Sequence, residues 1–515
     1  MNPLAELGPL PGLDATTLEG LSPDQQQSII TDVSKICRKM MVNLGVTWKP
    51  QPVDPTLRTS LVDWIKSQVQ PSIGKPVNKA FLLSTDGSAI FTEYVYEDHD
   101  AHTKLCMAKI LTLCLYLDDL AEKDDGMASQ AELFLTKMLD GGIPTDTAIP
   151  PQYRCWLELF RKHSLDLARC MSDPIATSML LHSFTVFLEA TALENRIQRD
   201  RAIYDTATCD VETERHHDQA YEQAANQGRE IPLPLDTDWV TNPTATNQPS
   251  YLRPDTFPTW LRERTGGTEI FIISSFRCPG GIDIPTAYWL PAIYEMRSFS
   301  NDINDLYSFA KEMLAGDTHS FIAMSTRDKR ALGVPGTASD GGWCLRDTLA
   351  EMCSRVLDTS GRTNRILRPK GRVGCRYGDD GSVLSVDEMV GMLKEEEPIV
   401  GAGRKRQDLM SALALRLWET HQRGYVAYHL QSTRYRAFEL FDWVREMAGE
   451  KGEGPGWILD QFATPSAVTT SLEEADGGKS VQEDTTFSGY GGHHQSRRSL
   501  LTRVTHMIKT WMGKQ

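Results

Sequence analysis

The sequence predicts an all-α protein. Apolar residues recur every three or four positions along most of the 515-residue chain, and few segments show the apolar–polar alternation of strands. Hydrophobic residues make up 40% of the composition, which is enough to form a large buried core. We therefore expect a helical bundle.

The first predicted helix begins after Ser22. Ser22 and Gln25 fit a capping box, and Pro23 stands at the first helical position, where it is best tolerated. Four apolar residues then follow at helical spacing: Ile29, Val33, Ile36 and Met40. The same spacing predicts further helices near residues 55–70, 99–122, 154–171, 174–198, 284–314 and 406–448.

Two polar stretches interrupt the helical pattern. Residues 203–254 are rich in Asn, Gln, Thr and Pro, and residues 358–384 are rich in Gly, Arg and Asp. We interpret both as loop insertions in a single helical domain that spans residues 1–462. Residues 463–515 are expected to form a low-complexity tail that ends in a basic helix.

Charge and cysteine usage exclude several classes of function. The chain carries 54 Lys and Arg against 69 Asp and Glu, a net charge of −15, which disfavours a nucleic-acid partner. Its ten cysteines contain no CxxC pair, so we expect buried, reduced thiols rather than a zinc module or a disulfide framework. No run of about 18 apolar residues occurs, which predicts a cytoplasmic protein without integral membrane association.

An acidic cluster ends one of the apolar helices. Asp118 and Glu122 are four residues apart, so both lie on one helix face, where their carboxylates could share a divalent cation. Carboxylates at a helix C-terminus also oppose the macrodipole, which favours a positive charge nearby. The alternative interpretation is a solvated helix end.

A second candidate metal site lies on a later helix. Asn304, Ser308 and Glu312 stand at i, i+4 and i+8, which turns only about 40° per step and leaves three oxygen-bearing side chains in one stripe. Such oxygens can together chelate one Mg²⁺. The neighbouring frame puts the phenyl ring of Phe309 where a ligand should be. An ordinary polar helix face is the alternative.

These segments resemble the motifs of class I terpene cyclases. Residues 118–122 resemble the aspartate-rich motif, and residues 304–312 resemble the second metal motif. Arg434-Tyr435 is similar to the C-terminal pair that these enzymes use on diphosphate. Arg262 takes the position of the diphosphate-sensing arginine, with Arg264 as the alternative.

All four motifs occur in the order of that family. The nearest relatives in this resemblance are fungal sesquiterpene cyclases of the trichodiene synthase-like family, a group that also contains longiborneol synthase. The family resemblance implies a class I terpenoid synthase helical bundle and favours a homodimer. It also implies that farnesyl diphosphate is ionised with three Mg²⁺ ions and cyclised to a sesquiterpene, either hydrocarbon or alcohol, with release of diphosphate.

The resemblance also assigns roles to individual residues. The implied metal ligands are Asp118, Glu122, Asn304, Ser308 and Glu312. The implied diphosphate-binding residues are Arg262, Lys311, Arg434 and Tyr435, and Asp118, Arg262, Arg434 and Tyr435 are the expected catalytic set. Aromatic residues that could line an apolar cavity for the carbocation are Phe91, Tyr116, Phe184, Phe187, Phe271, Trp289 and Tyr307.

Two rival functions stay open at the level of sequence. A chain-elongating prenyltransferase would use the same metals and fold, but it needs a second aspartate-rich motif where this chain has Asn304, Ser308 and Glu312. A non-catalytic helical relative would be favoured by the loss of a metal ligand or of Arg434, and each of these residues is present.

Overall fold

The computed structural model describes residues 3–123, 127, 130–131, 134, 149–199, 257–265, 267–278, 283–318, 320–369, 384–395, 403–449 and 457–462. Within these ranges the regular elements are helices, and the β pairing amounts to two isolated bridges, Arg277 with Asp283 and Pro335 with Gly342. The prediction of an all-α protein is confirmed.

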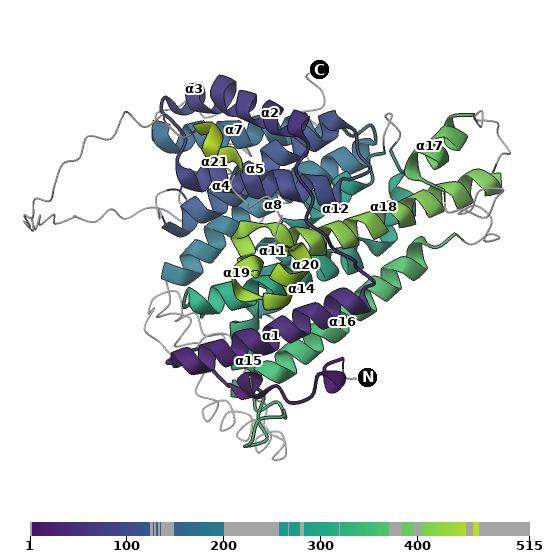
Figure 1. Cartoon of the computed structure of the whole chain (residues 1–515). Coiled ribbons are helices and arrows are strands. Elements are labelled where there is room, and N and C mark those ends of the chain that lie inside the picture. Colours follow the sequence, from purple (N-terminus) through teal and green to yellow (C-terminus); the bar gives the residue numbers. More distant parts are fainter. Residues whose placement is uncertain are drawn as a thin grey trace, which may run out of the picture.

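Two groups of helices pack on either side of the long helix α18 (Gly403–Gln431), which crosses the molecule (Figure 1). The upper group in Figure 1 consists of α2 (Pro55–Trp64), α3 (Gln70–Ile73), α4 (Lys79–Val95), α5 (Ala101–Lys123) and α7 (Pro151–Ala168). The lower group consists of α1 (Pro23–Asn43), α14 (Ile293–Leu314), α15 (Phe321–Ala331) and α16 (Leu345–Leu367). Helix α18 contacts α4 on one side and α14 and α16 on the other.

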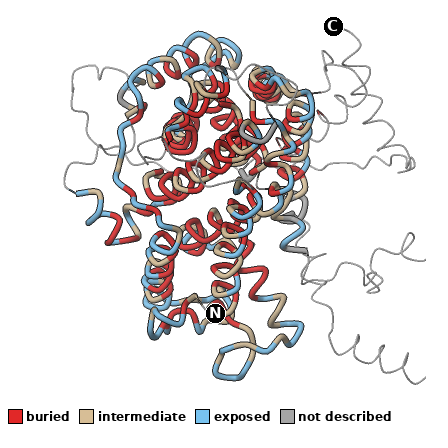
Figure 2. Tube along the Cα trace, turned by 90° about the vertical axis from the view of Figure 1, so that its right-hand side faces the viewer, coloured by how far each residue is buried: buried red, intermediate tan, exposed pale blue. Residues whose placement is uncertain are grey.

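Further elements complete the bundle. They are α8 (Pro174–Arg199), α11 (Phe257–Thr265), α12 (Thr268–Ser275), α13 (Thr286–Trp289), α17 (Val386–Glu395), α19 (Ala437–Leu440), α20 (Asp442–Ala448), α21 (Trp457–Phe462) and the 3₁₀ turns η1 (Ala5–Leu7), η2 (Pro11–Asp14) and η6 (Leu290–Ala292). Figure 2 shows the buried residues gathered on the inner faces of the helices, with exposed residues turned outward. One continuous core therefore connects both groups.

Helix α1 begins as predicted. The backbone N–H of Gln25 donates to the Ser22 hydroxyl at 3.3 Å, and the Ser22 N–H donates to the Gln25 amide oxygen at 2.8 Å. This capping box satisfies two backbone donors that the first turn leaves free, and it fixes the start of the helix.

Helix α4 lacks the amphipathic signal because every residue from Ser84 to Thr92 is buried. Its hydroxyl groups are satisfied within the helix: Thr85, Ser88 and Thr92 donate to the carbonyl oxygens four residues earlier at 2.7–2.9 Å. A helix that is buried on all sides shows no polar stripe, so the periodicity did not predict it.

The predicted helix over 406–448 is wrong in its second half. Helix α18 ends at Gln431, and Ser432 adopts an extended conformation with ψ of 132°. A 3₁₀ turn, η8 (Thr433–Tyr435), follows before α19. The predicted helix over 55–70 likewise divides into α2, a π-helical turn, η3 (Ile65–Val69), and the start of α3.

The second predicted insertion begins later than expected. Helix α16 continues to Leu367, so residues 358–367 are helical, and their apolar or hydroxyl side chains at Thr359, Thr363 and Leu367 are buried. Residues 370–383, the insertion at 203–254 and the tail at 463–515 lie outside the described residues. The described cysteines are all free thiols; Cys209 and Cys375 lie outside the described residues.

One helix passes a length-and-composition test for a membrane span. It is the Pro174–Leu193 part of α8, and half of that window is buried inside the protein. Core helices of globular bundles share these properties, so this is weak evidence for a span.

Candidate active site

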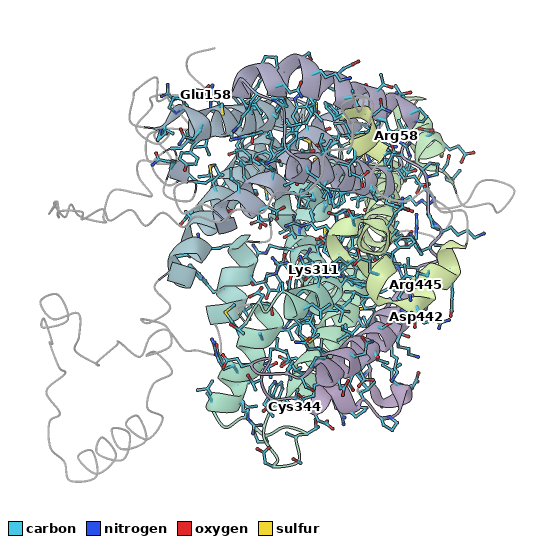
Figure 3. The ribbon with its side chains drawn as sticks, turned by 60° about the vertical axis from the view of Figure 1, so that its left-hand side comes forward. Arg58, Glu158, Lys311, Cys344, Asp442 and Arg445 are labelled. Atoms are coloured by element: carbon cyan, nitrogen blue, oxygen red, sulfur yellow. The ribbon has the colours of Figure 1, made fainter. Side chains whose placement is uncertain are left out.

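The site residues predicted from sequence come from four elements. Asp118 and Asp119 lie near the C-terminal end of α5, and Arg262 lies on α11. Asn304, Ser308, Lys311 and Glu312 follow one another along α14, and Arg434 and Tyr435 lie in the turn η8. Figure 3 shows Lys311 near the centre of the molecule.

Arg434 joins the turn after α18 to the acidic end of α5. Its guanidinium lies 2.7 Å from an oxygen of Asp119 and 3.3 Å from an oxygen of Asp118. The hydroxyl of Ser432 accepts from the Arg434 backbone N–H at 3.4 Å and so stabilises the break that turns Arg434 toward α5. Burial raises the pKa of Asp118, while the positive charge of Arg434 opposes this rise.

Arg262 contacts two residues in the middle of α14. Its Nε lies 2.7 Å from an oxygen of Asp305, and its Nη2 donates to the Asn304 amide oxygen at 2.8 Å. Arg264, the alternative from sequence, contacts Glu189 at 3.5 Å and lies over the Trp260 ring. Of the two arginines, the structure therefore brings Arg262 to the predicted metal stripe.

Hydrogen bonds fix the orientation of the Asn304 amide. Its nitrogen donates to the Tyr435 hydroxyl at 2.9 Å and lies 3.3 Å from Nε2 of His429. Nδ1 of His429 lies 2.7 Å from the Tyr425 carbonyl oxygen, to which it donates, so Nε2 is the acceptor. Burial lowers the pKa of His429 to about 3, which keeps the ring neutral. The Asn304 oxygen consequently faces Arg262.

The remaining stripe residues lie toward the end of α14. Ser308 is buried, and its hydroxyl donates to the Asp305 carbonyl oxygen at 3.4 Å. Burial raises the pKa of Glu312, opposed by the charge of Lys311 and by a hydrogen bond from Ser308. Lys311 also acts to lower the pKa of Asp118, so its ammonium lies within electrostatic range of both α5 and α14.

Two residues of this site were missed by the sequence analysis. Asp305 lies one turn before Phe309 on the same helix face, and the sequence analysis rejected that face because Phe309 is not a ligand. Burial nevertheless raises the pKa of Asp305 to about 7, and Arg262 pairs with it. His429 lacks a motif, although His421, Tyr425 and His429 share one helix face at four-residue spacing. That spacing was the available signal for a polar column inside α18.

The donor set suits a hard divalent cation. The carboxylates of Asp118, Asp119 and Glu312, the Asn304 amide and the Ser308 hydroxyl all offer oxygen, which Mg²⁺ prefers. Oδ2 of Asp305 is buried and has no hydrogen-bond partner within the described residues. Glu122 lies in α5, but its side chain is outside the described residues.

The candidate cavity residues divide into two groups. The ring of Phe91 lies 5.0 Å from those of Phe271 and Tyr428. The Tyr428 ring lies 5.4 Å from that of Tyr435, so this trio reaches the turn η8. Trp289 instead stacks on Phe276, and the Tyr307 hydroxyl donates to the Cys37 carbonyl oxygen at 3.0 Å. Three others pack on neighbouring aromatic rings: Tyr116 on Trp156, and Phe184 and Phe187 on Phe160.

Comparisons with known proteins found similarity among solved structures. No family model and no curated protein matches the chain. The linalool/nerolidol synthase from Streptomyces clavuligerus, solved with 2-fluorogeranyl diphosphate, is 14% identical with a TM-score of 0.39, and the match covers 75% of this chain and 97% of that chain. The germacradien-4-ol synthase from Streptomyces citricolor is 14% identical with a TM-score of 0.40, covering 74% of this chain and 95% of that chain. Similarity at this level assigns neither family nor activity.

Proposed function

We propose that this chain is a class I terpene cyclase that ionises farnesyl diphosphate with Mg²⁺ and cyclises the carbocation to a sesquiterpene. One observation carries the proposal. Four segments, predicted from sequence to bind metal and diphosphate, meet through direct contacts: Arg434 with Asp118, Arg262 with Asn304, and Asn304 with Tyr435. Residues 118 and 434 are separated by 316 positions in sequence, so local structure does not explain their meeting.

The reaction requires positive charge around the leaving group. Breaking the allylic C–O bond adds negative charge to a diphosphate that is already anionic. Mg²⁺ bound by Asp118, Asn304, Ser308 and Glu312 would supply Lewis-acid stabilisation of that charge. Arg262, Lys311 and Arg434 would donate to the phosphate oxygens, and the Tyr435 hydroxyl would add a neutral donor.

Ion pairs hold the arginines and carboxylates of the site in place before substrate binds. Arg434 pairs with both Asp118 and Asp119, and Arg262 pairs with Asp305. A diphosphate would compete with these carboxylates for the same guanidinium groups, because phosphate oxygens match the planar donor fork equally well. Binding of substrate would therefore free carboxylate oxygens at the moment when cations are needed.

The carbocation then needs an apolar, electron-rich surface. Phe91, Phe271 and Tyr428 lie together beside the turn that holds Arg434. Each ring could contribute about 0.5–2 kcal/mol by cation–π contact, and their apolar bodies would exclude water. We propose this trio as part of the cavity wall.

The rival functions make different use of the same residues. A chain-elongating prenyltransferase would need an aspartate-rich second motif, and here Asn304 is committed to an amide network with Tyr435 and His429. A non-catalytic relative would not require buried carboxylates, which are unfavourable unless a cation offsets them. A cytoplasmic location and a homodimer belong to the proposal as expectations.

The test is product analysis. The purified chain is incubated with geranyl, farnesyl and geranylgeranyl diphosphates and Mg²⁺, and volatile products are separated by gas chromatography with mass spectrometry. We expect one dominant cyclic C15 product from the farnesyl substrate, hydrocarbon or alcohol, and its loss on chelation. Exclusively linear alcohols, longer prenyl diphosphates, or turnover that survives chelation would contradict the proposal.

A further inference from the structure

The fold brings together three soft ligand groups that the candidate active site does not use. His102 and Cys106 lie four residues apart near the start of α5, and Cys170 lies in the turn that follows α7. One ligand atom from each of the three residues lies within 4.8 Å of the others, and Nε2 of His102 is 3.8 Å from Sγ of Cys106. Residues 106 and 170 are far apart in sequence, so only the packing of α5 on α7 makes this group.

The surroundings of the three residues suit a binding site near the surface. Cys106 is 7% exposed, Cys170 is partly buried, and His102 is exposed to solvent. The turn around Cys170 is fixed by backbone hydrogen bonds from Cys170 to Leu167 and from Met171 to Ala168. The sulfur of Cys170 donates to the Asp166 carbonyl oxygen at 3.4 Å, so its thiol is held on this side of α7.

We propose that His102, Cys106 and Cys170 bind one Zn²⁺ ion that clamps the start of α5 to the end of α7. One imidazole nitrogen and two thiolates are ligands that Zn²⁺ prefers, and three protein ligands leave a fourth position for water. Binding displaces the two thiol protons to solvent, forms two Zn–S bonds and one Zn–N bond, and changes no oxidation state. Nitrogen and sulfur ligands select against Mg²⁺, so the two metal sites of the chain would not compete.

The geometry favours a metal over the other use of two neighbouring thiols. A disulfide between Cys106 and Cys170 would use two of the three groups and leave His102 without a role. The i, i+4 placement of His102 and Cys106 presents both to the same point, as metal ligands on a helix are presented. The site lies about 24 Å along α5 from Asp118, because 16 residues separate His102 from Asp118. The metal would therefore act apart from the candidate active site, and the proposal does not depend on the proposed function.

Cobalt absorption provides the test. The full-length protein is reduced, freed of reductant and metal, and titrated anaerobically with Co²⁺. We expect a thiolate-to-cobalt charge-transfer band that saturates at about one equivalent per chain and disappears on addition of Zn²⁺, which binds more tightly in this series. Co²⁺ at the carboxylate site gives no such band, because that site offers oxygen ligands. Zn²⁺ should also raise the Tm by mass action.

Variants assign the signal to residues. His102→Ala, at an exposed position, should weaken Co²⁺ binding by at least about tenfold, and Cys170→Ser should remove most of the band. Cys155→Ser is the matched control, because Cys155 is a partly buried thiol on α7 outside the group. The proposal is overturned if no thiolate band appears, if the band is unchanged in His102→Ala, or if mass spectrometry finds a Cys106–Cys170 disulfide whose reduced form takes up no metal.

Discussion

Two neighbouring regions bury ionisable groups, and in both of them burial favours the neutral form, but the partners of these groups differ. The carboxylate cluster (Asp118, Asp119, Asp305 and Glu312) lies at α5 and α14, and the α18 column (Trp418, His421, Tyr425 and His429) runs along α18 beside it. Rings of the column follow one another at centroid distances of 5.3, 5.7 and 4.7 Å. Burial raises the pKa of Asp118, Asp305 and Glu312 in the cluster and lowers the pKa of both histidines to about 3.

The difference lies in the counter-charges. In the cluster, Arg434 and Arg262 pair with the carboxylates at 2.7 Å and hold them in a region that can accept cations. In the column, His421 contacts the hydroxyl groups of Ser275 and Ser300, and His429 bonds to a backbone carbonyl, so neither ring gains a negative partner. The cluster is thus arranged to hold charge for chemistry, whereas the column uses neutral polar groups to fix positions.

Removing an oxygen ligand from the carboxylate cluster or from the adjoining Asn304 should have the largest effect. Asn304→Ala and Asp118→Ala are each expected to lower turnover of farnesyl diphosphate by about 10²–10³-fold, because each removes stabilisation of developing diphosphate charge. Helical circular dichroism should stay unchanged, since neither substitution removes an apolar core side chain and Asn304→Ala removes only one amide contact with the column, that to His429. Glu158→Ala is the control, because Glu158 is exposed on α7 and lies far from Lys311 in Figure 3. Retained activity in both variants would remove the cluster from the mechanism.

The column depends on the close approach of α18 to α4. A Cβ at Gly424 would lie 2.1 Å from the Tyr94 carbonyl oxygen and 2.7 Å from the Val95 Cα, so Gly424→Ala must push the helices apart. We expect a loss of about 3 kcal/mol in the free energy of unfolding, measured with urea. Gly87→Ala is the matched control in α4: its Cβ would meet two side-chain hydroxyls, of Ser432 at 3.3 Å and of Tyr428 at 3.9 Å, and no backbone atom, so the variant should be nearly neutral. Equal stability of the two variants would mean that the helices are not held this closely.

We expect acid to lower the free energy of unfolding through the buried histidine His421 of the α18 column. The pKa of His421 is about 3 in the folded protein and about 6.5 when unfolded, so the unfolded chain binds more protons between these values. The free energy of unfolding should therefore fall as pH drops from 7 toward 3, with His421 contributing about 2 kcal/mol of the loss at pH 5.

His421→Gln tests that contribution. The variant should be less stable than the wild type at pH 8, because the contacts to Ser275 and Ser300 change, but its stability should decline less steeply toward pH 5. His182→Gln, at an exposed position on α8, serves as the control. Parallel pH profiles for His421→Gln and the wild type would show that His421 is not held neutral by the fold.

The elements predicted correctly from sequence are those that carry a periodic apolar pattern or a recognisable motif. Helix α1 and its cap followed from Ser22, Gln25 and the apolar spacing, and the four motif segments pointed to residues that do converge. Helix α4 was missed because burial on all sides erases the polar stripe by which periodicity identifies a helix. The break at Ser432 was missed because α18 and η8 carry no Pro or Gly there.

Long-range partners explain the remaining differences. Asp305 was set aside because Phe309 shares its helix frame, yet its role depends on Arg262, which reaches it from α11. The group of His102, Cys106 and Cys170 has no CxxC signature, since one of its three residues, Cys170, comes from the turn after α7. Spacing within one segment predicts which side chains share a face, but the packing of a second helix decides what that face meets.

Tyr435→Phe should have the smallest effect. It tests whether the Tyr435 hydroxyl orients Asn304 or binds the diphosphate directly. It removes the hydroxyl that accepts from the Asn304 amide at 2.9 Å, while the ring can keep its edge contact with Tyr428. We expect turnover to fall about tenfold, with the free energy of unfolding and its pH dependence unchanged.

A double-mutant cycle with Asn304→Ala gives the sharper result. If Tyr435 acts by orienting Asn304, then Tyr435→Phe should cost nothing further once Asn304 is alanine, since there is no amide left to orient. Additive losses would instead place the Tyr435 hydroxyl on the diphosphate itself, as the family resemblance implies. His429 belongs to both regions, because it contacts the Asn304 amide and packs edge-on against Tyr425 in the column. His429→Gln should therefore lower turnover and also flatten the acid profile. If only one of these properties changed, the column and the cluster would be independent regions rather than neighbours coupled through one histidine.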